Sequence, residues 1–337
     1  MPIIASEIKN YRSAVVGDGG TNGGRMSNVL VTDNVKNNLW PDVSSSQRAS
    51  GITQYRKCYI KFENSDGLAA ITPKVFIEDR TVGDDRVAFF AGTHTQADIQ
   101  SGISSPRLYG AGRLNANVSA AATSITVLVE TTVADALFLN GDTIRISDKT
   151  YTDSVSGNEE YVTITGTVTY AGLVATIPCS ALVNAYTAAT PTKVMSIYAP
   201  GTIRPVVSAP VKTSVSGVFN LANTGGNPIV QGPIGGVYDT WTLTFTSATA
   251  FGVTGTNTGS VGTGTTGANF VPNNVVFSSP FFTIPSAAWT GTWATGNTVT
   301  FTTTPSAIPI WMKRVVPVAA NSLSSNEVCL SIDTESA

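Results

Sequence analysis

Apolar and hydroxyl-bearing residues alternate along much of this 337-residue chain. Across residues 241–247, a tryptophan, a leucine and a phenylalanine are separated by threonines, and residues 298–303 repeat the arrangement with valine and phenylalanine. Successive side chains of a strand point to opposite faces of a sheet, so a period of two predicts strands with one buried face. No segment carries an extended apolar repeat of 3.6 residues, and the pattern therefore predicts an all-β protein.

Further strands are predicted where apolar alternation is bounded by turn-forming residues. Residues 57–62, for example, alternate lysine or tyrosine with cysteine, isoleucine or phenylalanine. Intervals of about ten residues between such segments, with Gly, Asp and Asn turns, favour immunoglobulin-like β-sandwiches. The predicted strands outside the two threonine-rich segments are 55–61, 74–78, 86–90, 124–129, 142–147, 160–165, 173–177, 310–317 and 326–333.

Composition and the positions of glycine and proline divide the chain into four regions. At 337 residues, the length fits two or three domains of roughly 100 to 200 residues each. The first region is polar and rich in Gly, Asn and Ser, and prolines interrupt the chain soon after residue 200. Residues 255–267, nearly pure Thr, Gly, Asn and Ser, are predicted to form a long surface loop. We predict an extended N-terminal arm over 1–50, a β-sandwich over 51–110, a small β barrel or sandwich module over 111–200, and a C-terminal β-sandwich over 201–337.

Two pairs of segments resemble each other within the chain. Residues 55–61 followed by 74–78, and residues 311–317 followed by 327–332, each join an aromatic and basic strand to a second alternating strand. Two arrangements fit this internal similarity. The segments are equivalent hairpins of two related sandwiches, which we favour, or they lie side by side in one discontinuous sandwich with residues 111–200 inserted.

Charge and cysteine content narrow the classes of partner and site. Charged residues make up 12% of the chain, against about 25% in a typical protein, and the formal net charge is -2. Without a basic block the sequence predicts no nucleic-acid partner, and no apolar run approaches the roughly 20 residues that span a bilayer, so no membrane partner is predicted. Three widely spaced cysteines, Cys58, Cys179 and Cys329, favour buried free thiols over a disulfide framework or a zinc site.

Several segments near both ends of the chain share a pattern with a known class of proteins. They are residues 35–43, 55–61, 241–245, 281–285, 289–305 and 308–317. Together they resemble a recurring kind of structural protein from the virions of tailed bacteriophages. The resemblance implies a non-enzymatic component present in many copies, located in the tail, baseplate, neck or head surface and assembled in the cytoplasm of the bacterial host. It carries over no functional residues, because the shared pattern marks strands and turns.

Two motifs that could support catalysis or nucleotide binding have simpler explanations. Gly262, Gly264 and Gly267 match the letters of a dinucleotide-binding loop, but such a loop needs a hydrophobic strand before it and a helix after it. His94 is the only histidine, so any catalytic triad would depend on it, and no Gly-x-Ser-x-Gly motif supplies a nucleophile. We expect His94 to be a polar loop residue.

Acidic residues were considered as catalytic pairs and as calcium ligands. Sugar cleavage needs two carboxyl groups about 5 to 9.5 Å apart, whereas the neighbours in Glu159–Glu160 and Asp84–Asp85 would point to opposite faces of an extended segment. Two sets of aspartates could bind calcium: Asp79, Asp84 and Asp85, and Asp142, Asp148 and Asp153. Neither set has the spacing of a calcium loop. We favour turn formation for these aspartates.

Clustered aromatic residues fit either a core or a carbohydrate groove. A β-sandwich of this size needs large side chains inside, so packing is the favoured interpretation. The residues concerned are Phe281, Phe282, Trp289, Trp293 and Trp311.

The sequence therefore predicts a structural protein with no catalytic, cofactor-binding or metal-binding residue. Its expected partners are copies of itself and other phage virion proteins, with a tail-associated position such as baseplate or neck preferred. Two alternatives remain open. The chain is a capsid decoration protein, or it is a tail module that binds host-surface glycan through exposed tryptophans and the 255–267 segment.

Overall fold

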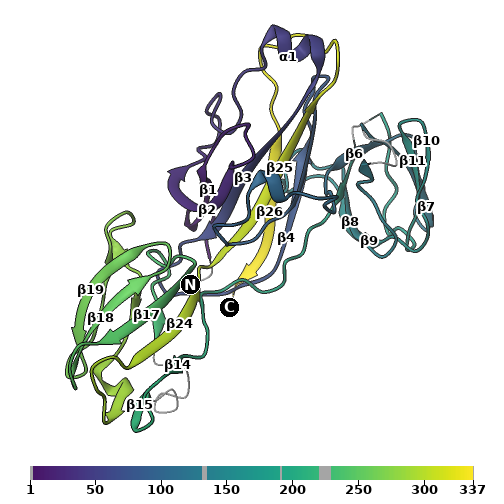
Figure 1. Cartoon of the computed structure of the whole chain (residues 1–337). Coiled ribbons are helices and arrows are strands. Elements are labelled where there is room, and N and C mark those ends of the chain that lie inside the picture. Colours follow the sequence, from purple (N-terminus) through teal and green to yellow (C-terminus); the bar gives the residue numbers. More distant parts are fainter. Residues whose placement is uncertain (1–2, 131–134, 190–191, 220–228, 337) are drawn as a thin grey trace.

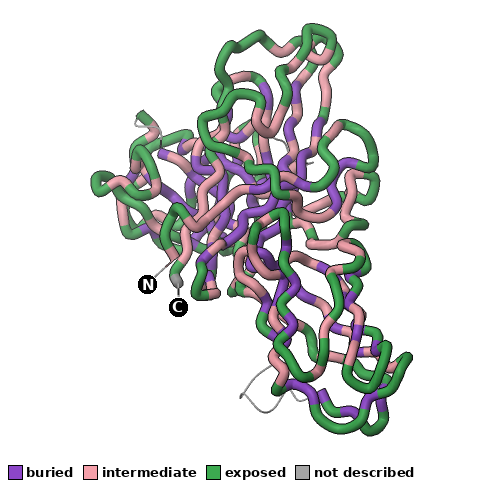
Figure 2. The backbone as a smooth tube through the Cα atoms, turned by 90° about the vertical axis from the view of Figure 1, so that its left-hand side faces the viewer, coloured by how far each residue is buried: buried purple, intermediate pink, exposed green. Residues whose placement is uncertain are grey.

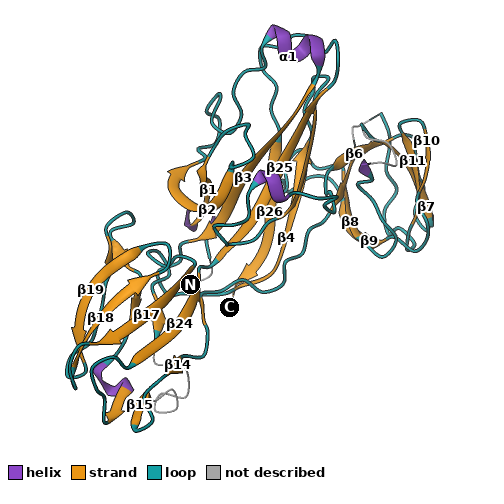
Figure 3. Cartoon of the chain, in the orientation of Figure 1, coloured by secondary structure: helices purple, strands orange, loops and turns teal. Residues whose placement is uncertain are grey.

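A computed structural model describes residues 3–130, 135–189, 192–219 and 229–336 of the chain. The fold is nearly all β, as predicted, and its strands form several sheets arranged as three units (Figures 1 and 3). Each segment predicted as a strand contains one, although several boundaries differ by a few residues. The described helical elements are short: α1 (Ser45–Ser50) and 3-10 turns at Ala5–Glu7, Gln100–Gly102 and Ser286–Ala288.

The central unit is built from both ends of the chain around a five-stranded antiparallel sheet. Its strand order is β2-β1-β3-β25-β5. β25 pairs with β3 from Ala307 opposite Lys61 to Val316 opposite Ile52, and on its other side it pairs with β5. The strands are β1 (Ile8–Val15), β2 (Gly23–Leu30), β3 (Ile52–Phe62), β5 (Arg86–Ala91) and β25 (Ala307–Val316).

The pairing of β25 with β3 overturns the favoured arrangement of two related sandwiches. The two internally similar pairs of segments lie side by side, because β26 (Cys329–Ser336) also pairs with β4 (Ala70–Asp79), and the members of each pair belong to different sheets. β4 and β26 form the second layer over the central sheet, with Ile60, Phe76 and Ile310 among the buried residues between them. Alternation shows that two strands are amphipathic, but it does not show which strands pair.

The predicted N-terminal arm is largely part of the central unit. β1 pairs with β3 from Ile8 opposite Phe62 to Arg12 opposite Cys58, and β2 forms the edge of the same sheet. The glycine-rich turn before β2 has a packing role. Gly23 has φ +115°, and a Cβ added there would lie 2.6 Å from the Trp311 ring, so this position requires glycine.

The middle unit, residues 111–197, projects to one side of the central unit (Figure 1). Its seven strands form one antiparallel sheet with the order β10-β11-β7-β6-β12-β8-β9, which does not close into a barrel. An isolated bridge between Ile164 and Cys179 links the two ends of the curled sheet. The strands are β6 (Ala111–Leu114), β7 (Ser124–Leu128), β8 (Thr143–Ser147), β9 (Glu159–Thr163), β10 (Thr169–Ala171), β11 (Val174–Pro178) and β12 (Lys193–Ser196).

The third unit, residues 206–304, is named the Thr-rich unit and projects at the other end of the molecule (Figure 1). Its main sheet has the order β13-β24-β17-β18-β19, with β14 also paired to β24. Short ladders pair β15 with β23, β16 with β22 and β20 with β21. The strands are β13 (Val206–Val207), β14 (Val211–Lys212), β15 (Gly217–Phe219), β16 (Val230–Gln231), β17 (Asp239–Phe245), β18 (Ala250–Gly255), β19 (Gly259–Thr265), β20 (Asn273–Asn274), β21 (Ser279–Pro280), β22 (Phe282–Thr283), β23 (Trp289–Gly291) and β24 (Thr298–Thr304).

The predicted loop over 255–267 is wrong, because most of it is the edge strand β19. Threonine favours strands through its branched Cβ, but the glycines hid the alternation that would have shown it. Gly264 is needed for close packing. A Cβ added there would come within 2.7 Å of the Phe251 and Phe270 rings.

Buried residues run through the strands of all three units, and exposed residues gather in loops and at strand ends (Figure 2). Among the described residues, the core of the Thr-rich unit is formed by its own side chains, with Trp241 and Phe282 both fully buried. The core of the middle unit, in contrast, extends onto the central sheet and includes Phe90 and Trp311. The central and middle units therefore share apolar packing.

Candidate functional site

The most unusual site lies on the second face of β3, where three polar side chains are buried. Cys58, Ile60 and Phe62 face β4 and β26, as the alternation suggests. Lys57, Tyr59 and Lys61 face the other way, yet all three are at most 1% exposed. Both faces of this strand are therefore covered, and the polar face needs internal partners.

The ammonium group of Lys57 is held in a closed network. Its Nζ donates to the Gly24 carbonyl at 2.8 Å and forms an ion pair with Asp98 Oδ2 at 2.9 Å. Asp98 also accepts from the Thr93 N–H at 2.6 Å and from Trp311 Nε1 at 3.0 Å. Burial would raise the pKa of Asp98, but these three donors together lower it. The pKa of Lys57 is lowered by burial, with Asp98 opposing the shift.

Lys61 holds the Thr-rich unit against the central sheet. Its Nζ donates to the Ile234 carbonyl, pairs with Glu63 at 3.2 Å and lies 3.8 Å from the centroid of the Phe277 ring. Phe277 also makes an edge contact with Tyr11, with ring centroids 5.5 Å apart. These contacts define the Lys61 clasp, in which a cation and two aromatic rings join β1 and β3 to the Thr-rich unit.

His94 lies at the same junction, between aromatic rings from two units. Its ring centroid is 6.0 Å from that of Tyr59 on β3 and 6.0 Å from that of Tyr238, the residue before β17. Burial, reinforced by the charge of Lys57, lowers the pKa of His94 from 6.5 to about 4, and the carbonyl of Ala307 partly opposes the shift. His94 is in a loop, as predicted, but its ring is half-buried between two aromatic side chains.

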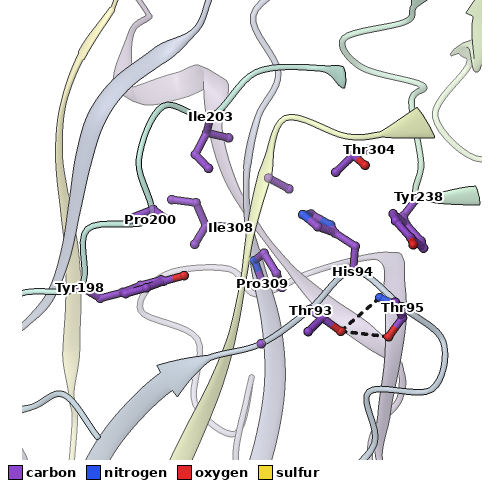
Figure 4. Close-up of a pocket in the computed structure, with 12 residues that line it drawn as sticks. Thr93, His94, Thr95, Tyr198, Pro200, Ile203, Tyr238, Thr304, Ile308 and Pro309 are labelled. Atoms are coloured by element: carbon purple, nitrogen blue, oxygen red, sulfur yellow. Dashed lines mark hydrogen bonds between the residues drawn. The ribbon is translucent and has the colours of Figure 1, made fainter. Parts of the chain in front are cut away.

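A shallow hollow of about 380 Å³ surrounds His94 (Figure 4). Tyr198, Ile203 and Ile308 line one side, and Tyr238 lies beside the imidazole on the other. A catalytic triad would place the histidine between an acid and a nucleophile. Here the ring lies between two phenol rings and beside an ammonium group, an arrangement suited to packing two units together.

The other predicted candidates are distributed over all three units. Gly262 and Gly264 lie on β19, and Gly267 follows it, so no helix N-terminus stands behind them. Glu159 pairs with Arg145, whereas Glu160 accepts from the backbone N–H groups of Val183 and Asn184. The adjacent glutamates therefore serve different contacts, as their positions in a strand suggested.

Five of the six aspartates considered as calcium ligands accept hydrogen bonds from the protein or form ion pairs, and the sixth, Asp153, lies in a turn. Asp79 pairs with Lys193 at 2.9 Å, Asp84 accepts from the Asn321 N–H at 2.7 Å, and Asp85 accepts from the Asn326 amide. Asp142 accepts from Leu139 N–H and Arg107, and Asp148 accepts from Asn158 N–H. Among the described residues, no cluster of three or more His, Cys, Asp or Glu side chains is placed to hold a metal ion.

The aromatic cluster is core, as favoured from the sequence. Trp289, Trp293 and Trp311 are 8%, 4% and 1% exposed, and Phe281 and Phe282 are also buried. A sugar cannot stack on these rings in this structure. The glycan-binding alternative therefore loses the exposed tryptophans on which it depended.

The cysteine prediction holds for two residues and is wrong for one. Cys58 and Cys179 are buried free thiols, and burial raises the pKa of Cys58 to about 12. Cys329 is exposed, because it begins the outer strand β26. Sequence reasoning also missed the network around Lys57. The sequence did contain a signal for this network: two lysines and a tyrosine lie on one face of a strand whose other face is apolar.

No family model, curated protein or solved structure matches this chain in comparisons of sequence and fold. Within the described part of the chain, the helices are all too short to cross a membrane.

Proposed function

We propose that this chain is a non-enzymatic structural component of a tailed-bacteriophage virion, associated with the tail at the baseplate or neck. It acts through contacts with copies of itself and with other virion proteins. The sequence resemblance supports this proposal, and its parts from opposite ends of the chain come together. Residues 55–61 and 308–317 lie in β3 and β25, which pair along their whole length.

The observation that carries the proposal is that the buried polar groups bind other parts of the same chain. Lys57, Asp98 and Lys61 hold loops and neighbouring units in place, with their polar atoms engaged inside the protein. This arrangement fixes how the Thr-rich unit is presented beside the central sheet. A protein that assembles by shape needs such fixed surfaces, whereas a catalyst needs groups free to meet a substrate.

Edge strands and exposed apolar side chains are the proposed means of contact. β2 is an edge of the central sheet, and its Val29 and Leu30 are 49% and 43% exposed. Edge strands offer unpaired backbone groups to a neighbour, and apolar contacts add buried area. Val29 and Leu30, in the predicted arm, thus remain accessible, although β2 is paired with β1 of the same chain.

Localisation in purified phage particles tests the proposal. An antibody against the chain, combined with imaging of intact particles, should label the tail at the baseplate or neck, and averaging should show several symmetry-related copies. Label on the head would support the decoration alternative instead. Absence of the chain from purified particles, or turnover of cell-wall material by the purified chain, would contradict the proposed function.

A further inference from the structure

His94 connects two units that are otherwise built separately. Its loop follows β5 of the central unit, and its ring lies between Tyr59 of the central sheet and Tyr238 of the Thr-rich unit. Figure 4 shows the imidazole beside Tyr238 and facing the hollow. A change in the charge of this ring would therefore act directly on the contact between the units.

We propose that His94 makes this junction sensitive to acid: when its imidazole takes up a proton, the Thr-rich unit loosens from the central unit while both units stay folded. This property does not depend on the virion function proposed above. The Lys61 clasp remains as the second attachment. Loosening is therefore a movement about the clasp rather than full separation.

The groups that face His94 leave an imidazolium without a free counter-ion. Asp98, the acidic group in the same loop, is already engaged by Lys57 at 2.9 Å, by the Thr93 N–H and by Trp311. The other neighbours are a second cation, neutral phenols and a backbone carbonyl. The titratable or charged groups, by element, are Lys57 and Tyr59 on β3, Asp98 in the loop of His94, Tyr238 before β17 and Tyr198 in the segment after β12.

A protonated ring at this position gains most by reaching water. The Ala307 carbonyl can stabilise it only in part, while Lys57 repels it and the apolar side chains of Ile203 and Ile308 cannot solvate it. Because the hollow is open to solvent on one side, displacement of Tyr238 is enough to hydrate the ring. Neither the core of the Thr-rich unit nor the pairing of β3 with β25 has to break.

The direction of the pH dependence follows from the two states. In the closed junction the pKa of His94 is about 4, and in an open, hydrated junction it returns toward 6.5. The open state therefore binds the proton more readily, and closure weakens as pH falls from 6.5 to 4. Above pH 6.5 closure is unaffected, and below pH 4 the loss is complete at roughly 300-fold in the equilibrium between closed and open forms.

Hydrogen exchange of the full chain, followed by mass spectrometry from pH 7 to pH 4, tests this inference. After correction for the intrinsic rate, peptides 92–97 and 234–238 should lose protection by tens to hundreds of fold. Peptides from β3 and β17 should keep theirs. The matched variant His94→Gln has no titrating ring and should show no such loss. Equal acid dependence in both proteins, or loss of protection in the strands at the same pH, would overturn the proposal.

Proton NMR supplies a second measurement that needs no variant. Because His94 is the only histidine, its ring resonance identifies itself in a titration of the full chain. An apparent pKa well below 6 supports a closed junction that disfavours the proton. An apparent pKa near 6.5 shows a ring that is hydrated at neutral pH, which contradicts the mechanism even if His94→Gln fails to fold.

Discussion

The Thr-rich unit and the central unit use the same alternating pattern in opposite ways. In the Thr-rich unit, Trp241 and Leu243 point into a core of local residues, and the intervening threonines form the outer face. In the central unit, both faces of β3 are buried, and one of them contains Lys57 and Lys61. The first unit is a continuous segment, whereas the second needs strands from both ends of the chain.

This difference shows what a period of two can and cannot establish. It identifies residues that share a face, because backbone geometry enforces that relation. Whether the face meets solvent depends on what the rest of the chain places over it. Lys57 lies on the polar face of its strand, and that face is covered because Gly24 on β2 and Asp98 in the loop after β5 hold the ammonium group.

The largest expected effect comes from separating the two units. A fragment of residues 201–305 should fold, because its core is local, while a fragment of residues 1–110 should not. The latter lacks β25, which lies between β3 and β5 and pairs with both. Amide chemical-shift dispersion and cooperative thermal unfolding would distinguish the two outcomes.

A co-expression control sharpens this comparison. Adding residues 306–337 as a separate chain should restore dispersion to fragment 1–110 at least in part, since β25 and β26 then return. If fragment 1–110 folds cooperatively by itself, the central unit does not need β25 and β26 from the other end of the chain. Failure of fragment 201–305 would show that the Lys61 clasp is needed for the Thr-rich fold.

The next largest effect is expected from the buried ion pair. Asp98→Asn keeps the shape of the side chain but leaves the Lys57 ammonium without its counter-ion, at a cost of about 3 kcal/mol in the free energy of unfolding. Denaturant titration would measure it. Adding Lys57→Met should recover part of the loss, because the unpaired charge is then removed.

An exposed ion pair provides the control for this measurement. Lys36 and Asp42 lie 3.5 Å apart with side chains 69% and 67% exposed, so Asp42→Asn should change stability little. An equally small effect of Asp98→Asn would mean that the Lys57 face is hydrated. The central unit would then resemble the Thr-rich unit more closely than the structure indicates.

A smaller effect is expected where the Thr-rich core contains a polar contact. Thr303 accepts from Trp241 Nε1 at 2.8 Å and donates to the Val237 carbonyl at 2.7 Å. Thr303→Val leaves both groups unpaired in the interior and should cost about 2 kcal/mol. The matched variant Thr302→Val, one residue away on the outer face, should be nearly neutral in the same denaturant titration.

The sequence predicted the strands of both units better than their assembly. Strong alternation located β17, β24 and β3 within a few residues, and large aromatic residues were correctly assigned to the core. β19 was missed because Gly264 replaces an apolar residue on its inner face and the register shift next to Gly262 breaks the alternation. The side-by-side position of β3 and β25 was one of two arrangements that the internal similarity allowed. The sequence could not choose between them, since the pairing joins segments about 250 residues apart.

The Lys57 network and the junction at His94 were not predicted, for a related reason. Asp98, Gly24 and Tyr238 are unremarkable in sequence, and only the fold brings them to Lys57 and His94. A buried lysine and an exposed lysine have the same local pattern when the covering residues come from elsewhere. Site prediction therefore failed where it depended on long-range packing.

The smallest expected effect concerns the outer face of the Thr-rich sheet. Thr244 is exposed and lies opposite Thr298 on β24, so Thr244→Lys should change the free energy of unfolding by about 0.5 kcal/mol or less. Tyr59→Lys, placed on the covered face of β3, should be far more disruptive. If particle incorporation nevertheless falls with Thr244→Lys while stability is unchanged, then the threonine face contacts a neighbour in the assembly. The open face and the covered face would then differ only in where their partner comes from, another chain or this one.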